Sequence, residues 1–175
     1  MTRAFVSMGS NIEPEENTEK AIRLLGGEVR ITGISTIYLT EAEGRPEQAK
    51  YYNCVVEIET DTSPGELKHG VLRRIENELG RTRSDDAFAP RTIDLDLILY
   101  NDLVMATEDL TLPDPDIVRR PFLAIPLQEL APGLVLPGSG LRIDEVASAM
   151  KRQNMKPLAD YTEHIRKEVL HERKQ

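Results

Sequence analysis

Two acidic residues, Asp94 and Asp96, stand two positions apart in the otherwise apolar run of residues 92–100. If this run forms a strand, side chains alternate between its faces, so Thr92, Asp94 and Asp96 share one face. The two carboxylates then lie ~7 Å apart along the strand. Mg²⁺ binds one or two carboxylates together with waters and phosphate oxygens, and it would neutralise such a pair. The spacing therefore indicates a metal-assisted phosphate site; the alternative is a strand face that is simply polar.

Three arginines accompany the acidic pair: Arg91 directly precedes the run, and Arg81 and Arg83 lie in a polar loop upstream. A guanidinium keeps its charge and binds phosphate oxygens through paired hydrogen bonds. Acidic residues beside several arginines therefore indicate a nucleoside triphosphate site, with ion pairs to Asp85 and Asp86 in a solvated loop as the alternative. The sequence has no Walker loop, no G-x-G-x-x-G turn and no evident Ser-His-Asp set. Phosphoryl chemistry is thus favoured over acyl transfer.

The chain has 175 residues and a formal net charge of -8, which fits one domain. The acidic balance argues against a protein that coats nucleic acid, since phosphate neutralisation needs a basic face. No run approaches the ~18 apolar residues of a membrane span, and the N-terminus lacks a signal-peptide pattern. We therefore expect a cytoplasmic protein that acts on small molecules, with neither nucleic acid nor membrane as a partner. The single cysteine, Cys54, excludes an internal disulfide and is expected to be a buried thiol.

The elements that position these residues follow from hydrophobic periodicity and turn signals. The clearest helix start is the capping box of residues 63–66, and an apolar stripe continues that helix to Leu79. The order strand, helix, two strands, helix, strand predicts an α+β fold, a ferredoxin-like βαββαβ plait with C-terminal additions. The segments of the plait are 3–8, 15–25, 29–39, 51–60, 63–79 and 92–100, and the additions are a helix over 116–130, a hairpin over 134–141 and a helix over 143–150.

We expect two parts in the chain: an α+β domain in residues 1–150 and a charged, helical C-terminal extension in residues 151–175. The extension keeps an apolar stripe at helical spacing, formed by Leu158, Tyr161, Ile165 and Val169. That stripe predicts docking on the body of the protein or on a partner, which includes self-association. A frayed, solvated helix is the alternative.

Several motifs between about Arg3 and Met150 match a known family together. The most specific is Pro90-Arg91-Thr92-Ile93-Asp94-Leu95-Asp96-Leu97. The others are Gly9-Ser10-Asn11, Tyr51-Tyr52-Asn53, Ile75-Glu76 with Gly80-Arg81-Thr82-Arg83, and Arg119-Arg120-Pro121-Phe122. With these motifs the chain resembles the 6-hydroxymethyl-7,8-dihydropterin pyrophosphokinases of folate biosynthesis. The resemblance implies Mg²⁺-dependent transfer of the two terminal phosphates of ATP, as one unit, to the pterin hydroxymethyl oxygen, giving AMP and the pterin diphosphate.

The resemblance also implies roles for individual residues. Those implied at the phosphates are Asp94 and Asp96, which would hold two Mg²⁺ ions, with Arg91, Arg81 and Arg83. Those implied in nucleotide binding are Glu76, Leu97, Thr111 and Arg120. Those implied in pterin binding are Thr40, Tyr51, Asn53 and Phe122, with the two rings against the pterin and the Asn53 amide at its edge. The polar loops 41–50 and 81–91 are expected to close over the substrates and exclude water.

Some positions depart from the family pattern. Ala87, Asp109 and Asp114 stand where charged, usually basic, residues or a histidine are common, and the pterin loop reads Glu41-Ala42-Glu43 where prolines and an aliphatic residue are usual. Asp109 and Asp114 leave open a non-catalytic homologue that binds nucleotide and pterin. A nucleotidyltransferase with a D-x-D pair is a further alternative. It is disfavoured because such sites place a Gly-Ser element shortly before the acidic strand, whereas Gly9-Ser10 lies far upstream.

Overall fold

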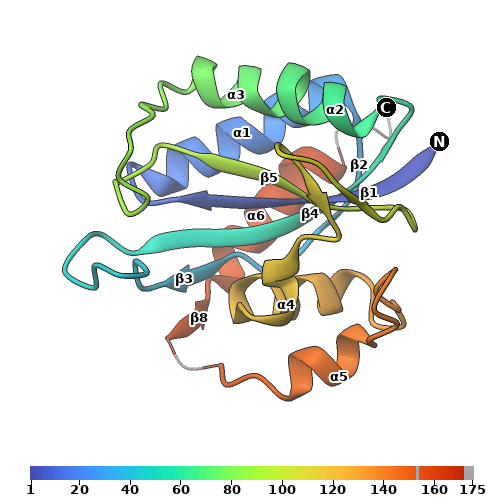
Figure 1. Cartoon of the computed structure of the whole chain (residues 1–175). Helices are drawn as coiled ribbons and strands as arrows, with labels where there is room; N and C mark the ends of the chain where they lie inside the picture. The colour runs from blue at the N-terminus through green and yellow to red at the C-terminus, as the bar shows by residue number, and fades with distance from the viewer. Residues whose placement is uncertain (153, 172–175) are drawn as a thin grey trace.

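The computed structural model describes residues 1–152 and 154–171, and its core is an antiparallel sheet with helices on both faces (Figure 1). The strands of this sheet are β1 (Thr2–Ser10), β2 (Arg30–Ile34), β3 (Tyr38–Thr40), β4 (Tyr51–Thr60), β5 (Asp94–Tyr100) and β8 (Met155–Pro157). Within the described residues their order is β5-β1-β4-β3-β8, and β2 also pairs with β4. A separate hairpin joins β6 (Met105–Ala106) to β7 (Thr111–Leu112). These elements confirm the predicted mixed α and β class.

The helices lie in two layers on opposite faces of the sheet (Figure 1). One face carries α1 (Pro14–Glu28), α2 (Pro64–Glu66), the π-helical turn Leu67–Leu72, α3 (Arg73–Glu78) and α6 (Ala159–Leu170). The other face carries the 3₁₀ turn Pro115–Val118, α4 (Pro121–Leu130) and α5 (Ile143–Ser148). None of the helices in the described residues combines the length and apolar character that crossing a membrane requires.

The helical segment of residues 64–78 begins where the capping box predicts. The Ser63 hydroxyl accepts a hydrogen bond from the Glu66 amide at 3.4 Å, and Pro64 takes the first helical position, where an N–H would lack a helical partner. The segment ends before Gly80, whose φ of 75° is readily adopted only by glycine. This sharp exit directs the loop 81–91 back toward the start of β5.

The two faces of β1 and β5 divide the core. Ala4, Val6 and Met8 pack toward α1, whereas Phe5 packs toward α4. β5 follows the same alternation until Ile98, where an irregularity in its pairing with β1 places both Ile98 and Leu99 on the α4 side. Asp94 and Asp96 precede this point, so the predicted alternation holds for them.

Three predicted segments differ from the structure. The helix expected over 116–130 is interrupted, because Pro121 disfavours a helical residue before it and Arg120 is extended with φ −114° and ψ 117°. The β-rich segment 29–39 divides into β2 and β3. β5 begins at Asp94, so Thr92 lies before the strand and not on the face that Asp94 and Asp96 share.

Residues 155–170 complete the sheet and its core. β8 pairs with β3, and Ile165 and Val169 of α6 are buried in the cluster that contains α1 (Figure 1). The Thr162 hydroxyl accepts a hydrogen bond from the Ile37 amide at 2.9 Å and donates one to the Leu158 carbonyl at 2.8 Å. The apolar stripe of this segment is therefore used within the chain.

Candidate active site

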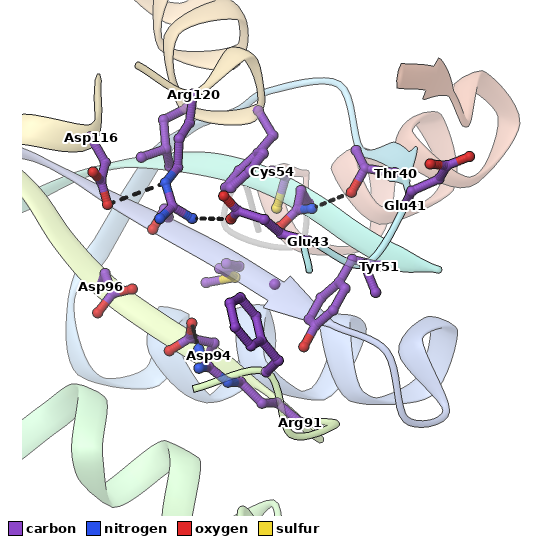
Figure 2. A pocket seen from close by; sticks show the side chains of 18 of the residues that line it. Thr40, Glu41, Glu43, Tyr51, Cys54, Arg91, Asp94, Asp96, Asp116 and Arg120 are labelled. Atoms are coloured by element: carbon purple, nitrogen blue, oxygen red, sulfur yellow. Dashed lines mark hydrogen bonds and ion pairs between the residues drawn. The ribbon is translucent and has the colours of Figure 1, made fainter. Parts of the chain in front are cut away.

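A cleft of about 470 Å³ lies on the α4 side of the sheet, between α4 and the loops 41–50 and 81–91 (Figure 2). The residues predicted for function that line it are Thr40, Tyr51, Asn53, Arg91, Asp94, Asp96, Arg120 and Phe122. The predicted residues outside its lining are Glu76, Arg81, Arg83, Leu97 and Thr111. The strands β4, β1 and β5 thus bring the residues predicted for the pterin and for the metal to one floor.

The acidic pair lies at the β5 side of the cleft, and its two members differ in their surroundings. Asp94 accepts hydrogen bonds from Arg81 Nη1 at 3.0 Å and from Arg91 Nη1 at 2.5 Å. The Asp96 carboxylate is open to the cleft and has no hydrogen-bond partner among the described residues. Desolvation by the surrounding protein, with the charges of Asp94 and Asp114, raises the pKa of Asp96 to about 7.

The donor set at this position suits Mg²⁺. Among the described residues, no three or more His, Cys, Asp or Glu side chains converge to form a metal cage. An unpartnered carboxylate beside a second carboxylate remains, and Mg²⁺ commonly takes its other ligands from water and from substrate phosphates. An Mg²⁺–phosphate ligand would also relieve the repulsion that Asp96 experiences from its neighbours.

Glu76 anchors two of the predicted arginines behind this site. Its side chain is only 5% exposed and forms ion pairs with Arg81 Nη1 and, at 2.7 Å, with Arg83 Nη2. The same carboxylate accepts a hydrogen bond from the Leu95 amide at 3.2 Å, which ties α3 to β5. Arg81 therefore bridges Glu76 and Asp94, and through Asp94 it fixes the position of the acidic pair on the side away from the cleft.

Three of the four residues predicted for nucleotide binding do not line the cleft: Glu76, Leu97 and Thr111. Leu97 is buried in the core on the α1 side, as the strand alternation requires, and Thr111 is exposed on β7. The alternative pairing of the arginines with Asp85 and Asp86 does not form for Asp86, which instead binds Arg45 Nη2 at 2.5 Å.

The β4 end of the cleft has the polar and aromatic groups predicted for the pterin. The Asn53 amide nitrogen donates a hydrogen bond to the Thr40 hydroxyl at 2.7 Å, so the Asn53 amide oxygen is left to accept from a ligand (Figure 2). Tyr51 and Phe122 both line the cleft, and burial raises the pKa of the Tyr51 hydroxyl. The floor between these groups is Gly9, where any Cβ would lie 2.8 Å from the Asn53 amide oxygen.

Arg120 spans the cleft opening from the α4 side. Its Nη1 contacts Glu43 at 2.5 Å, and its Nε contacts Asp116 at 3.3 Å (Figure 2). The guanidinium also lies 5.7 Å from the centre of the Phe122 ring. A phosphate that binds Arg120 must therefore compete with the Glu43 carboxylate.

The two loops that the sequence predicts to cover the cleft contact each other. Gln48 Nε2 donates to the Phe88 carbonyl at 3.1 Å, in addition to the Arg45–Asp86 ion pair. Gly44 has a φ of 75°, and the Phe88 ring would come within 2.6 Å of a Cβ at that position. Both loops line the cleft, so their contacts enclose its outer end.

Sequence reasoning missed Ser7, Phe88 and Asp116, which also line the cleft. Ser7 could have been found because it lies two residues before Gly9, on the same strand face. Asp116 could have been found because it lies four residues before Arg120. Cys54 is buried as expected, and burial raises the pKa of its thiol to about 12.

Comparison with known proteins gives one consistent result. The family model of 7,8-dihydro-6-hydroxymethylpterin-pyrophosphokinase matches residues 5–132. A 2-amino-4-hydroxy-6-hydroxymethyldihydropteridine pyrophosphokinase of Bacillus subtilis is 41% identical over 130 residues, which are 73% of this chain and 77% of that protein. The enzyme of the same name from Haemophilus influenzae is 37% identical over 142 residues, 79% of this chain and 88% of that protein.

Solved structures show the same fold at low identity. The crystal structure of Plasmodium falciparum HPPK-DHPS, wild type with STZ-DHP, is similar with a TM-score of 0.67 at 15% identity, over 89% of this chain and 45% of that one. A structure of HPPK-DHPS in complex with substrates has a TM-score of 0.68 at 13% identity, over 89% of this chain and 46% of that one. This chain therefore spans less than half of those longer chains.

Proposed function

The chain belongs to the 7,8-dihydro-6-hydroxymethylpterin-pyrophosphokinase family, and from this premise we propose that it transfers diphosphate from ATP to 6-hydroxymethyl-7,8-dihydropterin. The products are AMP and the pterin diphosphate, an intermediate of folate biosynthesis. The observation that carries this proposal is the cleft in which one sheet face joins an amide and two aromatic rings to an acidic pair and two arginines.

The β4 end of the cleft binds the pterin. Tyr51 and Phe122 provide aromatic faces for a flat heterocycle, and the Asn53 amide oxygen accepts from its N–H groups. Thr40 positions that amide by accepting its N–H. Gly9 keeps the floor flat, so the ring can approach the backbone of β1.

The β5 end binds the polyphosphate of ATP. Arg91 and Arg120 line the cleft and contact phosphate oxygens directly, while Arg81 and Arg83, held by Glu76, supply positive charge behind the acidic pair. Fixed positive groups at this position stabilise the charge that develops during transfer without reorganising. Of the other residues predicted for the nucleotide, Glu76 acts through the two arginines that it holds, and Leu97 and Thr111 do not line the cleft.

Asp94 and Asp96 would hold two Mg²⁺ ions, which when bound neutralise the polyphosphate and orient it for in-line transfer. Asp96 has a free carboxylate for this role, whereas Asp94 already binds Arg81 and Arg91. The residues of the chain position the substrates and exclude water. They align the pterin hydroxymethyl group with the β-phosphorus, and the contacts between loops 41–50 and 81–91 limit the access of water to the reacting groups.

The departures at Asp109 and Asp114 differ in how near they lie to the acidic pair, because only the charge of Asp114 contributes to the raised pKa of Asp96. Asp109 lies 3.8 Å from His69 Nε2 and does not line the cleft. Asp114 accepts a hydrogen bond from the Asp116 amide at 2.8 Å and caps the 3₁₀ turn that leads to α4. Asp109 therefore lies away from the substrates, whereas Asp114 adds negative charge beside Asp96 that a bound Mg²⁺ would offset.

Incubation of the protein with ATP, Mg²⁺ and the dihydropterin, followed by ³¹P NMR and chromatography of nucleotides, tests the function. The proposal requires AMP to form only when the pterin is present. Diphosphate release would indicate a nucleotidyltransferase, and release of neither product would indicate a binding protein without turnover.

We also propose that the fold is a ferredoxin-like plait, which the order β5-β1-β4 followed by β2 and β3 supports. Residues 1–150 carry the chemistry, and residues 155–170 brace the sheet. We also propose a cytoplasmic location. Self-association through residues 151–175 would have to use the polar face of α6, because Ile165 and Val169 are buried within the chain; light scattering tests it.

A further inference from the structure

The central strand of the cleft floor contributes Ser7, Met8 and Gly9 to the lining of the cleft. β1 lies between β4 and β5, and on the α4 side it carries Gly9 and then Ser7. Gly9 pairs with Asn53 on one side and Asp94 on the other, while Ser7 pairs with Val55 and with Asp96. Ser7 is thus the side chain of the floor that lies next to Asp96 and one step from the pterin end.

The Ser7 hydroxyl has no partner within the described part of the chain. The residue is only 9% exposed and lines the cleft, yet its Oγ forms no hydrogen bond there. Its Oγ is not one of the fully buried polar atoms without a partner in the described residues, so it reaches the cleft and can bond to a polar group there. Ser7 therefore points to a polar ligand group above β1.

The proposed reaction would bring a polar group of the substrate, its hydroxymethyl oxygen, to this place above β1. If the pterin ring lies over β4 and the polyphosphate over β5, the hydroxymethyl oxygen that joins them must lie above β1. Gly9 offers no side chain, and Val55 is apolar. Ser7 is the hydroxyl on the floor between the two substrates.

Resting on the proposed function, we propose that Ser7 Oγ accepts a hydrogen bond from the hydroxymethyl O–H of the pterin and so positions the acceptor oxygen for attack. The O–H is held toward the sheet, which leaves a lone pair of the same oxygen free to face the β-phosphorus. On transfer, this oxygen bonds to the β-phosphorus, the bond from the β-phosphorus to the α-phosphate oxygen breaks to release AMP, and the hydroxyl proton is released to solvent. Ser7 then contributes both to selecting a pterin that carries a 6-hydroxymethyl group and to aligning it.

Two ligands that differ only in this hydroxyl test the proposal. Binding of 6-hydroxymethylpterin and of 6-methylpterin is measured by calorimetry with a non-hydrolysable ATP analogue and Mg²⁺, for the wild type, Ser7→Ala and the control Ser139→Ala, which changes an exposed hairpin turn. The wild type and the control are expected to prefer the hydroxymethyl compound about threefold to tenfold, as for one neutral hydrogen bond. In Ser7→Ala this preference should fall to about one.

Stability and kinetics separate this role from a structural one. Without ligands, Ser7→Ala should melt close to the wild-type temperature, because the Ser7 hydroxyl faces the cleft and makes no hydrogen bond within the described residues. In turnover it should lower kcat while the KM for ATP stays unchanged. Retention of the full preference by Ser7→Ala overturns the proposal. Failure of the wild type to bind either pterin overturns the proposed function as well, so the two failures are distinguishable.

Discussion

Replacing Asp96 with asparagine is expected to stabilise the metal-free protein at pH 8 and to abolish AMP formation. The free energy of unfolding should change because the pKa of Asp96 is raised from 3.8 to about 7 in the folded protein. Between about pH 4 and pH 7 the folded protein holds a proton that the unfolded chain has lost, so wild-type stability falls as the pH rises through this window. The asparagine variant carries no such charge and should not show this loss.

The magnitude follows from the difference in pKa. About three pKa units correspond to roughly 4 kcal/mol above pH 7. Water reaches the Asp96 carboxylate from the cleft, so solvent screening reduces the gain to about 1–2 kcal/mol. The activity is lost nonetheless, because the amide is a weak substitute for a carboxylate toward Mg²⁺.

Urea unfolding in EDTA, at pH 4 and at pH 8, measures the effect. Asp102→Asn is the matched control, since it makes the same change on an exposed turn after β5. The gain for Asp96→Asn should be present at pH 8 and nearly absent at pH 4, and the control should show neither. A variant less stable than the wild type at pH 8, or a gain of equal size at both pH values, would refute the electrostatic reasoning, and wild-type turnover would refute the metal assignment.

Three further predictions follow from the cleft. Gly9→Ala should weaken pterin binding about tenfold in calorimetry, because the new Cβ would lie 2.8 Å from the Asn53 amide oxygen. Gly133→Ala is the control, since a Cβ at that position would have no atom within 4 Å. Unchanged pterin affinity in Gly9→Ala would contradict the role of Gly9 in the cleft floor. Glu76→Gln should lower the free energy of unfolding by about 2 kcal/mol in urea titrations, since it removes the charge that Arg81 and Arg83 share; wild-type stability would show that this buried cluster contributes nothing. ATP binding should weaken at least tenfold in EDTA relative to Mg²⁺ buffer, and equal affinities in calorimetry would count against metal-dependent binding.

Local signals predicted much of the fold. The capping box set the start of the helix at Pro64, and strand alternation placed Asp94 and Asp96 on one face with Leu97 in the core. These features depend on residues close in the sequence, so periodicity and capping chemistry are sufficient to find them. The same alternation failed beyond Ile98, because a bulge depends on how β5 pairs with β1.

The parts of the site that escaped prediction are formed by residues distant in the sequence. The Arg45–Asp86 and Arg120–Glu43 ion pairs join loops whose proximity is set by the sheet order. Charge alone offered several partners for each arginine, and only the packed sheet selects among them. Ser7 is a similar case, since its importance arises from lying between β4 and β5 and not from its neighbours in the sequence.

The pairing of β8 with β3 bears on how the protein can be shortened. β3 is three residues long, and its outer side is covered by Met155–Pro157. A truncated protein that ended at residue 150 would expose that strand edge and the apolar core residues against which Ile165 and Val169 pack. An exposed strand edge can pair with the same edge of another molecule, which promotes aggregation. Screening for inhibitors or crystals therefore calls for protein that retains the segment through α6.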